Sequence, residues 1–119
     1  MQKPAVLITG ASSGIGFELA KIFAKNGFNL VLVSKDAQKL EKARKQINGR
    51  GTIITIPKDL SDLRAPKELY RQIKNAGFEV EILVNNAGFG VWGKFETQSL
   101  DKVEKMLQLN IVTLTSLTH

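Results

Sequence analysis

The glycine-rich segment Thr9–Gly16, with the sequence TGASSGIG, carries the clearest chemical signal in this chain. It follows the apolar run Ala5–Ile8, and its glycines stand at positions 10, 14 and 16. Gly10 lets the chain turn sharply, and Gly16 lets a following helix pack closely against a sheet. The loop brings backbone N–H groups toward an anion, and the helix N-terminus adds about half a positive charge. The segment therefore predicts a phosphate site; the alternative is a plain tight turn.

Two further polar segments also follow apolar runs. Asp59-Leu60 comes after the run 52–56, and Asn85–Gly88 comes after the run 80–84. Ligands of open α/β sheets bind beyond the carboxyl ends of the strands, so we expect all three loops to meet in one crevice. Each segment also has a simpler interpretation, because aspartate and asparagine are common turn formers.

The elements that must position these loops alternate along the chain. Apolar runs predict strands at 5–8, 29–33, 52–56 and 80–84, with amphipathic helices between them. Continuous apolar strands separated by helices are typical of a parallel sheet covered on both faces, with strand order 3-2-1-4. The faces expected to point inward hold Ile15, Leu19, Ile22 and Phe23; Leu40, Ala43 and Ile47 behind an Asp36 cap; and Leu69, Ile73 and Ala76 behind Pro66.

The last segment predicts one long helix or two abutting ones from Ser99 onward. An apolar stripe runs through Leu100, Val103, Leu107, Ile111 and Leu114. The chain stops within this pattern, and a sheet that ended at the fourth strand would expose an apolar edge. We therefore expect residues 1–119 to be the N-terminal part of a single larger domain.

In this order and on these elements, the glycine motif, Asp-Leu and NNAG resemble the short-chain dehydrogenase/reductase family across essentially the whole chain. The resemblance implies a doubly wound, Rossmann-like α/β sheet that binds a nicotinamide dinucleotide. It implies that the pyrophosphate and its ribose are held by Gly10, Ser12, Ser13, Gly14, Ile15 and Gly16. It also implies that Asp59 accepts from the adenine amino group beside Leu60, and that Asn86, Ala87 and Gly88 run along the nicotinamide-side ribose.

By the same resemblance, Asn110 is the family's helix asparagine and orders a water in the proton relay. Its alternative is a buried, satisfied amide. Tyr70 and Lys74 match the family's Y-x-x-x-K, but they precede NNAG, whereas the family's pair follows it. At i, i+4 spacing they are expected to share an outer helix face without a catalytic role. Because Tyr70 is the chain's only tyrosine, we expect these 119 residues to be an inactive cofactor half-site.

The cofactor preference depends on the end of the second strand. An NAD-preferring site has a carboxylate there, which binds the ribose hydroxyls and would repel a 2′-phosphate. Aligned on the strand, this position falls on Lys35, and Ser34 is placed to donate a further hydrogen bond. NADP(H) is therefore expected over NAD(H). A one-residue shift would place Asp36 there instead, and the plainer alternative is that Asp36 only caps its helix.

The composition of the chain argues against several classes of protein. The net charge is +6, but the lysines and arginines are scattered among glutamates, which favours solvated helix faces over a nucleic-acid surface. There is no cysteine, so disulfides and thiolate metal sites are excluded. The apolar runs are far shorter than the roughly 18 residues of a membrane span, and a cytoplasmic protein without a membrane partner is expected.

The resemblance, together with Lys35 at the end of the second strand, implies an NADP(H)-dependent oxidoreductase that transfers hydride between nicotinamide and a small-molecule carbonyl or secondary alcohol. The resemblance also implies a homo-oligomer, either a dimer or a tetramer. The alternative is a non-catalytic NADP(H)-binding module that acts as a sensor or partner subunit. The segment Phe89–Phe95, with its two glycines and Trp92, suits either a substrate-pocket wall or a subunit contact.

Overall fold

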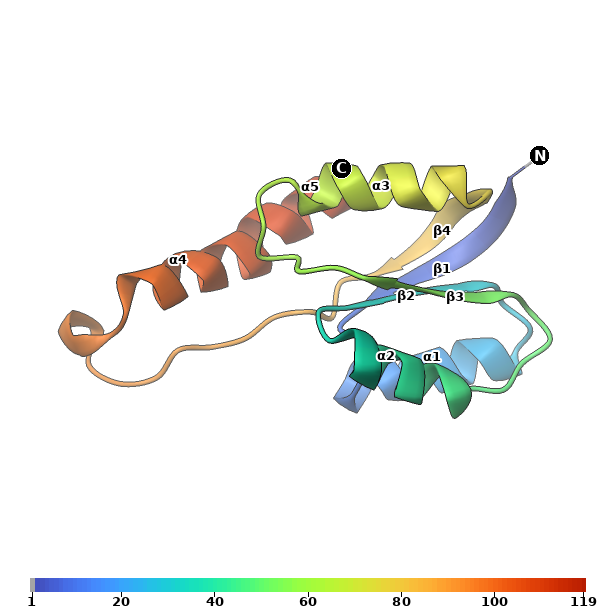
Figure 1. The fold of residues 1–119 in the computed structure, drawn as a ribbon, viewed down its shortest axis with the longest axis horizontal. Coiled ribbons are helices and arrows are strands. Elements are labelled where there is room, and N and C mark those ends of the chain that lie inside the picture. Colours follow the sequence, from blue (N-terminus) through green and yellow to red (C-terminus); the bar gives the residue numbers. More distant parts are fainter. Residues whose placement is uncertain (1) are drawn as a thin grey trace.

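The computed structural model describes residues 2–119 and contains a four-stranded parallel sheet in the order β3-β2-β1-β4 (Figure 1). The predicted α/β class and strand order are confirmed. The strands are β1 (Lys3–Thr9), β2 (Leu30–Ser34), β3 (Ile53–Pro57) and β4 (Phe78–Val84). The helices are α1 (Gly14–Lys25), α2 (Ala37–Lys45), α3 (Ala65–Asn75), α4 (Leu100–Leu107) and α5 (Leu114–Thr118).

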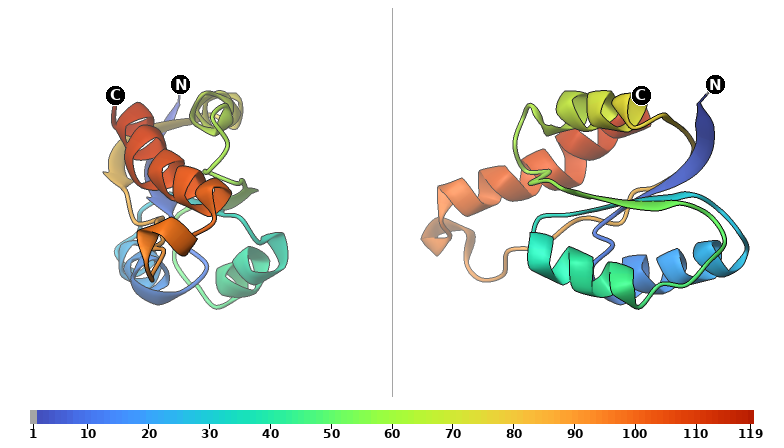
Figure 2. Two further views of the ribbon diagram at one scale, coloured as in Figure 1. Left: turned by 90° about the vertical axis from the view of Figure 1, so that its left-hand side faces the viewer. Right: turned by 45° about the vertical axis from the view of Figure 1, so that its right-hand side comes forward.

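Helices cover both faces of this sheet. The helices α1 and α2 lie on one face, while α3 and α5 lie side by side on the other (Figures 1 and 2). The central strands β1 and β2 are buried on both sides and send alternate residues to the two cores. The core beneath α1 and α2 includes Val6, Ile8, Leu30 and Leu32, and the core beneath α3 includes Ala5, Leu7, Val31 and Val33.

The inner face of α1 differs from the prediction. Its fully buried residues are Gly16, Ala20 and Ala24, and Phe23 packs against the same core as predicted, whereas Ile15 is 73% exposed and Ile22 is 57% exposed. The reason is a close approach of backbones, since a Cβ built on Gly16 would lie 2.5 Å from the Gly10 carbonyl oxygen. Only small side chains fit between a helix and a sheet at that separation, and hydrophobicity alone did not reveal it.

The second and third helices follow the prediction more closely. In α2 and just after it, Leu40, Ala43 and Ile47 are buried as expected. In α3, Leu69 and Ile73 are buried, but Ala76 is exposed. Ala76 lies one residue beyond the end of the helix, which stops there because Gly77 takes a left-handed φ of +83°.

The C-terminal helical segment has a different buried face from the one expected. A 3-10 turn (Phe95–Thr97) precedes α4, and a π-helical segment (Gln108–Thr113) joins α4 to α5. Of the predicted stripe, Val103 is buried, but Leu100, Leu107, Ile111 and Leu114 are 67%, 46%, 56% and 38% exposed. The face toward the core carries Leu109, Thr113 and Leu117 instead.

The position of α4 explains this outcome. It projects beyond the end of the sheet and gives the molecule its long dimension, 50 Å against 27 and 21 Å (Figure 1). The apolar side chains of α4 therefore meet little of the core. The edge strand β4 is also open, since Val80 and Ile82 are each 37% exposed.

Within residues 2–119, no helix has both the length and the apolar character needed to cross a membrane.

Candidate functional site

The glycine loop leaves the end of β1 as predicted and opens toward solvent. Gly10 and Gly14 have φ values of +66° and +58°, which side chains rarely adopt. In the part of the chain that the structure describes, the Ser13 side chain makes no capping hydrogen bond to α1. The first N–H groups of α1 therefore remain available to an anion. A Cβ on Gly14 would meet no atom within 4 Å, so the loop leaves open space above this helix end.

A partly buried polar network holds the glycine loop against the loop that follows β4. The Asn86 side chain donates from Nδ2 to the carbonyl oxygens of Thr9 and Gly10, both at 3.1 Å. The Thr9 hydroxyl accepts from the backbone N–H groups of Asn86 at 3.1 Å and Ala87 at 3.0 Å. It donates in turn to the Val84 carbonyl oxygen at 3.3 Å. The side chain of Asn86 thus positions the loop, and the backbone of Ala87 is fixed beside it.

Thr9 opens the glycine-rich segment, but no role for its side chain was predicted from the sequence. It is 2% exposed and connects the ends of β1 and β4 through one hydroxyl group. Its signal in the sequence was a polar side chain at the end of an otherwise apolar strand.

Asp59 lies at the end of β3 with a preorganised carboxylate. Its Oδ1 accepts from the Ser61 hydroxyl at 2.6 Å and from the Ser61 N–H at 3.0 Å. Its Oδ2 lies 3.7 Å from Nζ of Lys35. The Ser61 hydroxyl is the main cause that lowers the pKa of Asp59, and Lys35 adds to the effect. Asp59 is therefore a charged acceptor at this edge.

The neighbouring Leu60 is 5% exposed and belongs to the core beneath α3. Its carbonyl oxygen accepts from the buried Thr113 hydroxyl of the π-helical segment. The C-terminal helical segment thereby anchors the loop that carries Asp59.

At the end of β2, a hydroxyl pair joins this strand to the glycine loop. Ser12 Oγ and Ser34 Oγ lie 2.9 Å apart. Lys35 follows with 79% of its side chain exposed. The Asp36 carboxylate accepts from the Lys39 N–H at 3.0 Å and caps α2. The alternative in which Asp36 caps its helix is therefore the arrangement observed, and Lys35 is the first side chain beyond the strand.

Asn110 lies in the π-helical segment and holds the loop after NNAG. Its Nδ2 donates to the Phe89 carbonyl oxygen at 2.8 Å, and its Oδ1 accepts from the Phe89 N–H at 3.2 Å. A Cβ on Gly88 would lie 3.1 Å from Asn110 Oδ1, so the backbone of Gly88 passes close to this side chain. The half-buried Asn110 side chain is thus satisfied by the loop it supports.

Tyr70 and Lys74 lie far from these loops. Lys74 Nζ lies 5.7 Å from the centroid of the Tyr70 ring and donates to Gln2 at 2.8 Å. Gln2 precedes β1, so the pair belongs to the amino side of the sheet, and Tyr70 is 61% exposed.

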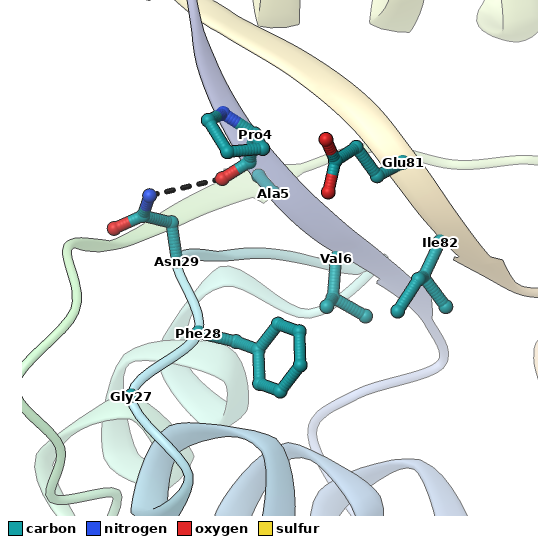
Figure 3. Close-up of a pocket in the computed structure, with 8 residues that line it drawn as sticks. All are labelled: Pro4, Ala5, Val6, Gly27, Phe28, Asn29, Glu81 and Ile82. Carbon is teal, nitrogen blue, oxygen red and sulfur yellow. Dashed lines mark hydrogen bonds between the residues drawn. The ribbon is translucent and has the colours of Figure 1, made fainter.

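A hollow of about 160 Å³ lies at that same amino side and is separate from the site (Figure 3). Pro4, Val6, Phe28 and Ile82 are among its lining residues. Asn29 closes one side by donating to the Pro4 carbonyl oxygen at 2.9 Å. The hollow borders the early part of β1, whereas the glycine loop follows the end of that strand.

The carboxyl edge of the sheet therefore gathers the predicted residues from all four strands. The N–H groups at the start of α1 are available to a phosphate. The charged Asp59 carboxylate is available to a hydrogen-bond donor, and Lys35 to a second anion. In residues 2–119, no cluster of three metal-ligating side chains is present. This arrangement fits an elongated ligand with phosphate groups near its centre.

Comparison with known proteins agrees with this geometry. The short chain dehydrogenase family profile matches residues 4–119. Dehydrogenase/reductase SDR family member 7 of Mus musculus is 34% identical over 118 residues, which cover 95% of this chain and 35% of that protein. The chain thus spans about a third of the length of this curated relative.

Two solved structures are also similar. A short-chain dehydrogenase from Sphingobium yanoikuyae in complex with NADPH has a TM-score of 0.84 and 35% identity, covering 97% of this chain and 45% of that one. A metagenomic short-chain oxidoreductase in complex with NADP has a TM-score of 0.87 and 29% identity, covering 97% of this chain and 52% of that one. With its glycine loop, Asp-Leu and NNAG at one sheet edge, the chain belongs to the short-chain dehydrogenase/reductase family.

Proposed function

We propose that the full-length protein is an NADP(H)-dependent oxidoreductase that transfers hydride between nicotinamide and a small carbonyl or secondary alcohol. The observation that carries this proposal is the uncapped start of α1 under an open glycine loop, tied by Asn86 to the loop after β4. Family membership supports it, and so do the similar structures solved with NADPH and NADP.

Each site residue has a proposed role. The backbone around Gly10, Ser12, Ser13, Gly14, Ile15 and Gly16 would hold the pyrophosphate and its ribose. Asp59 Oδ2 is free of the Ser61 hydrogen bonds and would accept from the adenine amino group. Ala87 and Gly88 would lie along the nicotinamide-side ribose. The bound cofactor supplies the hydride, and these residues only fix its position.

The preference for NADP(H) over NAD(H) rests on the end of β2. The Asp36 carboxylate accepts from the Lys39 N–H and caps α2, which supports the proposal that it does not serve as the acceptor for a ribose diol. Lys35 and the Ser34 hydroxyl lie at the end of β2 and suit a 2′-phosphate. Replacing Lys35 with Asp is expected to move the preference toward NAD(H), and dissociation constants for NADPH and NADH test this.

We propose that residues 1–119 bind cofactor without turnover. Carbonyl reduction needs a general acid within hydrogen-bond reach of the substrate oxygen. The chain's single tyrosine lies at the amino side of the sheet, and Asn110 is engaged by Phe89. The general acid is then supplied by the rest of a full-length protein. The test is NADPH oxidation by that protein across a panel of aldehydes and ketones.

A non-catalytic NADP(H)-binding module is the second candidate. The position of Tyr70, far from the cofactor loops, is the observation that favours it. One measurement distinguishes the two candidates. The non-catalytic module would bind NADPH stoichiometrically, but none of the carbonyl compounds tested would lead to NADPH oxidation.

We also propose a cytoplasmic homo-oligomer. The exposed apolar side chains of α4 support assembly, because exposed apolar patches mark contact surfaces. Light scattering of the full-length protein should give the mass of a dimer or tetramer. A monomer at micromolar concentration would contradict this part of the proposal.

A further inference from the structure

A second hollow, of about 130 Å³, lies between α1 and α2 beside the glycine loop. It is lined by Ser12, Phe17, Lys39, Lys42, Ala43 and Gln46. Because Ser12 Oγ lies 2.9 Å from Ser34 Oγ, the hollow adjoins the end of β2. Two lysines of α2 therefore line a space next to the residues proposed to meet a 2′-phosphate.

These two lysines differ from Lys35 in their electrostatic surroundings. Lys35 lies 3.7 Å from the Asp59 carboxylate, so its charge is shared with an acid that has its own proposed role. Among the ion pairs of residues 2–119, none involves Lys39 or Lys42. Their charges are thus the uncompensated ones at this end of the site.

The backbone of α2 sets where these side chains lie. Asp36 accepts from the Lys39 N–H and fixes the first turn of the helix, while Leu40 and Ala43 face the core. Lys39 and Lys42, three residues apart, then share the side of α2 that borders the hollow. Lys39 is the nearer of the two to the end of β2 along the chain, because β2 ends at Ser34.

We propose that Lys39, assisted by Lys42, is a specificity-determining residue that binds the 2′-phosphate of NADP(H) from the α2 side. The phosphate lies between Lys39 and the hydroxyl pair of Ser12 and Ser34, and Lys35 contributes from the end of β2 with a charge that it shares with Asp59. This inference rests on the proposed function. It adds a charged contact that distinguishes the phosphorylated from the unphosphorylated ribose.

The test compares Lys39→Gln with Lys45→Gln in the full-length protein. Both variants remove one positive charge from α2, but Lys45 ends the helix and does not line the hollow. Calorimetric titration with NADPH, NADH, 2′,5′-ADP and 5′-AMP gives the dissociation constants. Lys39→Gln should weaken binding of NADPH and 2′,5′-ADP about tenfold, as expected for a lost charge-assisted hydrogen bond. NADH and 5′-AMP should change by less than about twofold, and Lys45→Gln should change all four probes equally little.

Three results would overturn the inference. If Lys39→Gln weakens the binding of NADPH no more than Lys45→Gln does, Lys39 does not contact the phosphate, although the proposed function stands. If Lys39→Gln weakens the binding of NADPH and of NADH equally, Lys39 only positions α2. If wild-type protein binds neither dinucleotide, the inference and the proposed function both fail.

Discussion

At the scale of single residues, the site depends on the partly buried side-chain amide of Asn86. The two donor hydrogens of Asn86 meet the carbonyl oxygens of Thr9 and Gly10. The same Nδ2 atom lies 2.8 Å from a Cβ built on Gly10 and 2.5 Å from one built on Gly16. The glycines are thus required partly because an asparagine from the β4 loop fills the space where their side chains would be.

Replacing Asn86 with Ala should therefore destabilise the fold. It leaves two carbonyl oxygens without their donor, at a cost of about 1–3 kcal/mol. Asn85→Ala is the matched control, because the Asn85 amide makes an exposed hydrogen bond to Thr118. That variant should stay within about 0.5 kcal/mol of wild type. Urea unfolding of both variants measures the difference, and equal losses would show that the network is unimportant.

Gly10 and Gly14 have similar φ values, so alanine variants at the two positions distinguish the cost of backbone strain from the cost of steric crowding. Gly10→Ala and Gly14→Ala both force alanine into a left-handed conformation, at about 1–2 kcal/mol each. Only Gly10→Ala also drives a methyl group against Asn86 and the Ala87 backbone. We expect its thermal midpoint to fall well below that of Gly14→Ala. Identical midpoints would contradict the close contact described here.

The pKa of Asp59 gives a prediction for pH dependence. Its carboxyl has a lowered pKa in the folded state, mainly because the Ser61 hydroxyl donates to it. Stability from this group is therefore present above its unfolded pKa and is lost as pH falls through the lower, folded pKa. Ser61→Ala should raise the pKa of Asp59, as measured by carboxyl carbon NMR. An unchanged titration would show that Ser61 does not set it.

At the scale of elements, the sequence predicted the strands and a helix cap, which depend on local patterns. It did not predict the buried faces of α1 and of the C-terminal helical segment, because these depend on how closely a helix approaches the sheet. The strands followed from short apolar runs, although Glu81 interrupts the fourth, and Asp36 caps α2 as expected. The inner face of α1 was missed because the spacing between helix and sheet is set by Gly16, not by Ile15 or Ile22. The apolar stripe of α4 was misplaced because the core lies on the side of Thr113.

The exposed face of α4 and the π-helical segment gives a prediction for assembly. Ile111 is 56% exposed, and a charge there should disfavour burial against another subunit. Ile111→Glu should lower the mass of the full-length protein in light scattering. Lys102→Glu, at an exposed position of α4, is the control and should keep the wild-type mass. An unchanged mass for Ile111→Glu would place the subunit contact elsewhere.

At the scale of the whole molecule, four loops gather at one edge because every strand is parallel. This is why Gly10, Lys35, Asp59 and Asn86 could be assigned to one site from the sequence, although they are far apart along the chain. The hydroxyl groups of Thr9 and Thr113 could not be assigned in this way. Their roles depend on contacts with the Asn86 backbone and the Leu60 carbonyl oxygen, which are distant in sequence and leave no periodic signal.

The most direct test of this account is a calorimetric titration of the full-length protein with NADPH and, separately, NADH. The account predicts saturable binding of NADPH that is at least about tenfold tighter than binding of NADH, since a phosphate held by lysine and hydroxyl groups is worth more than about 1.4 kcal/mol. Binding of neither dinucleotide would contradict the assignment of this sheet edge as a cofactor site. Tighter binding of NADH would contradict the role given to Lys35.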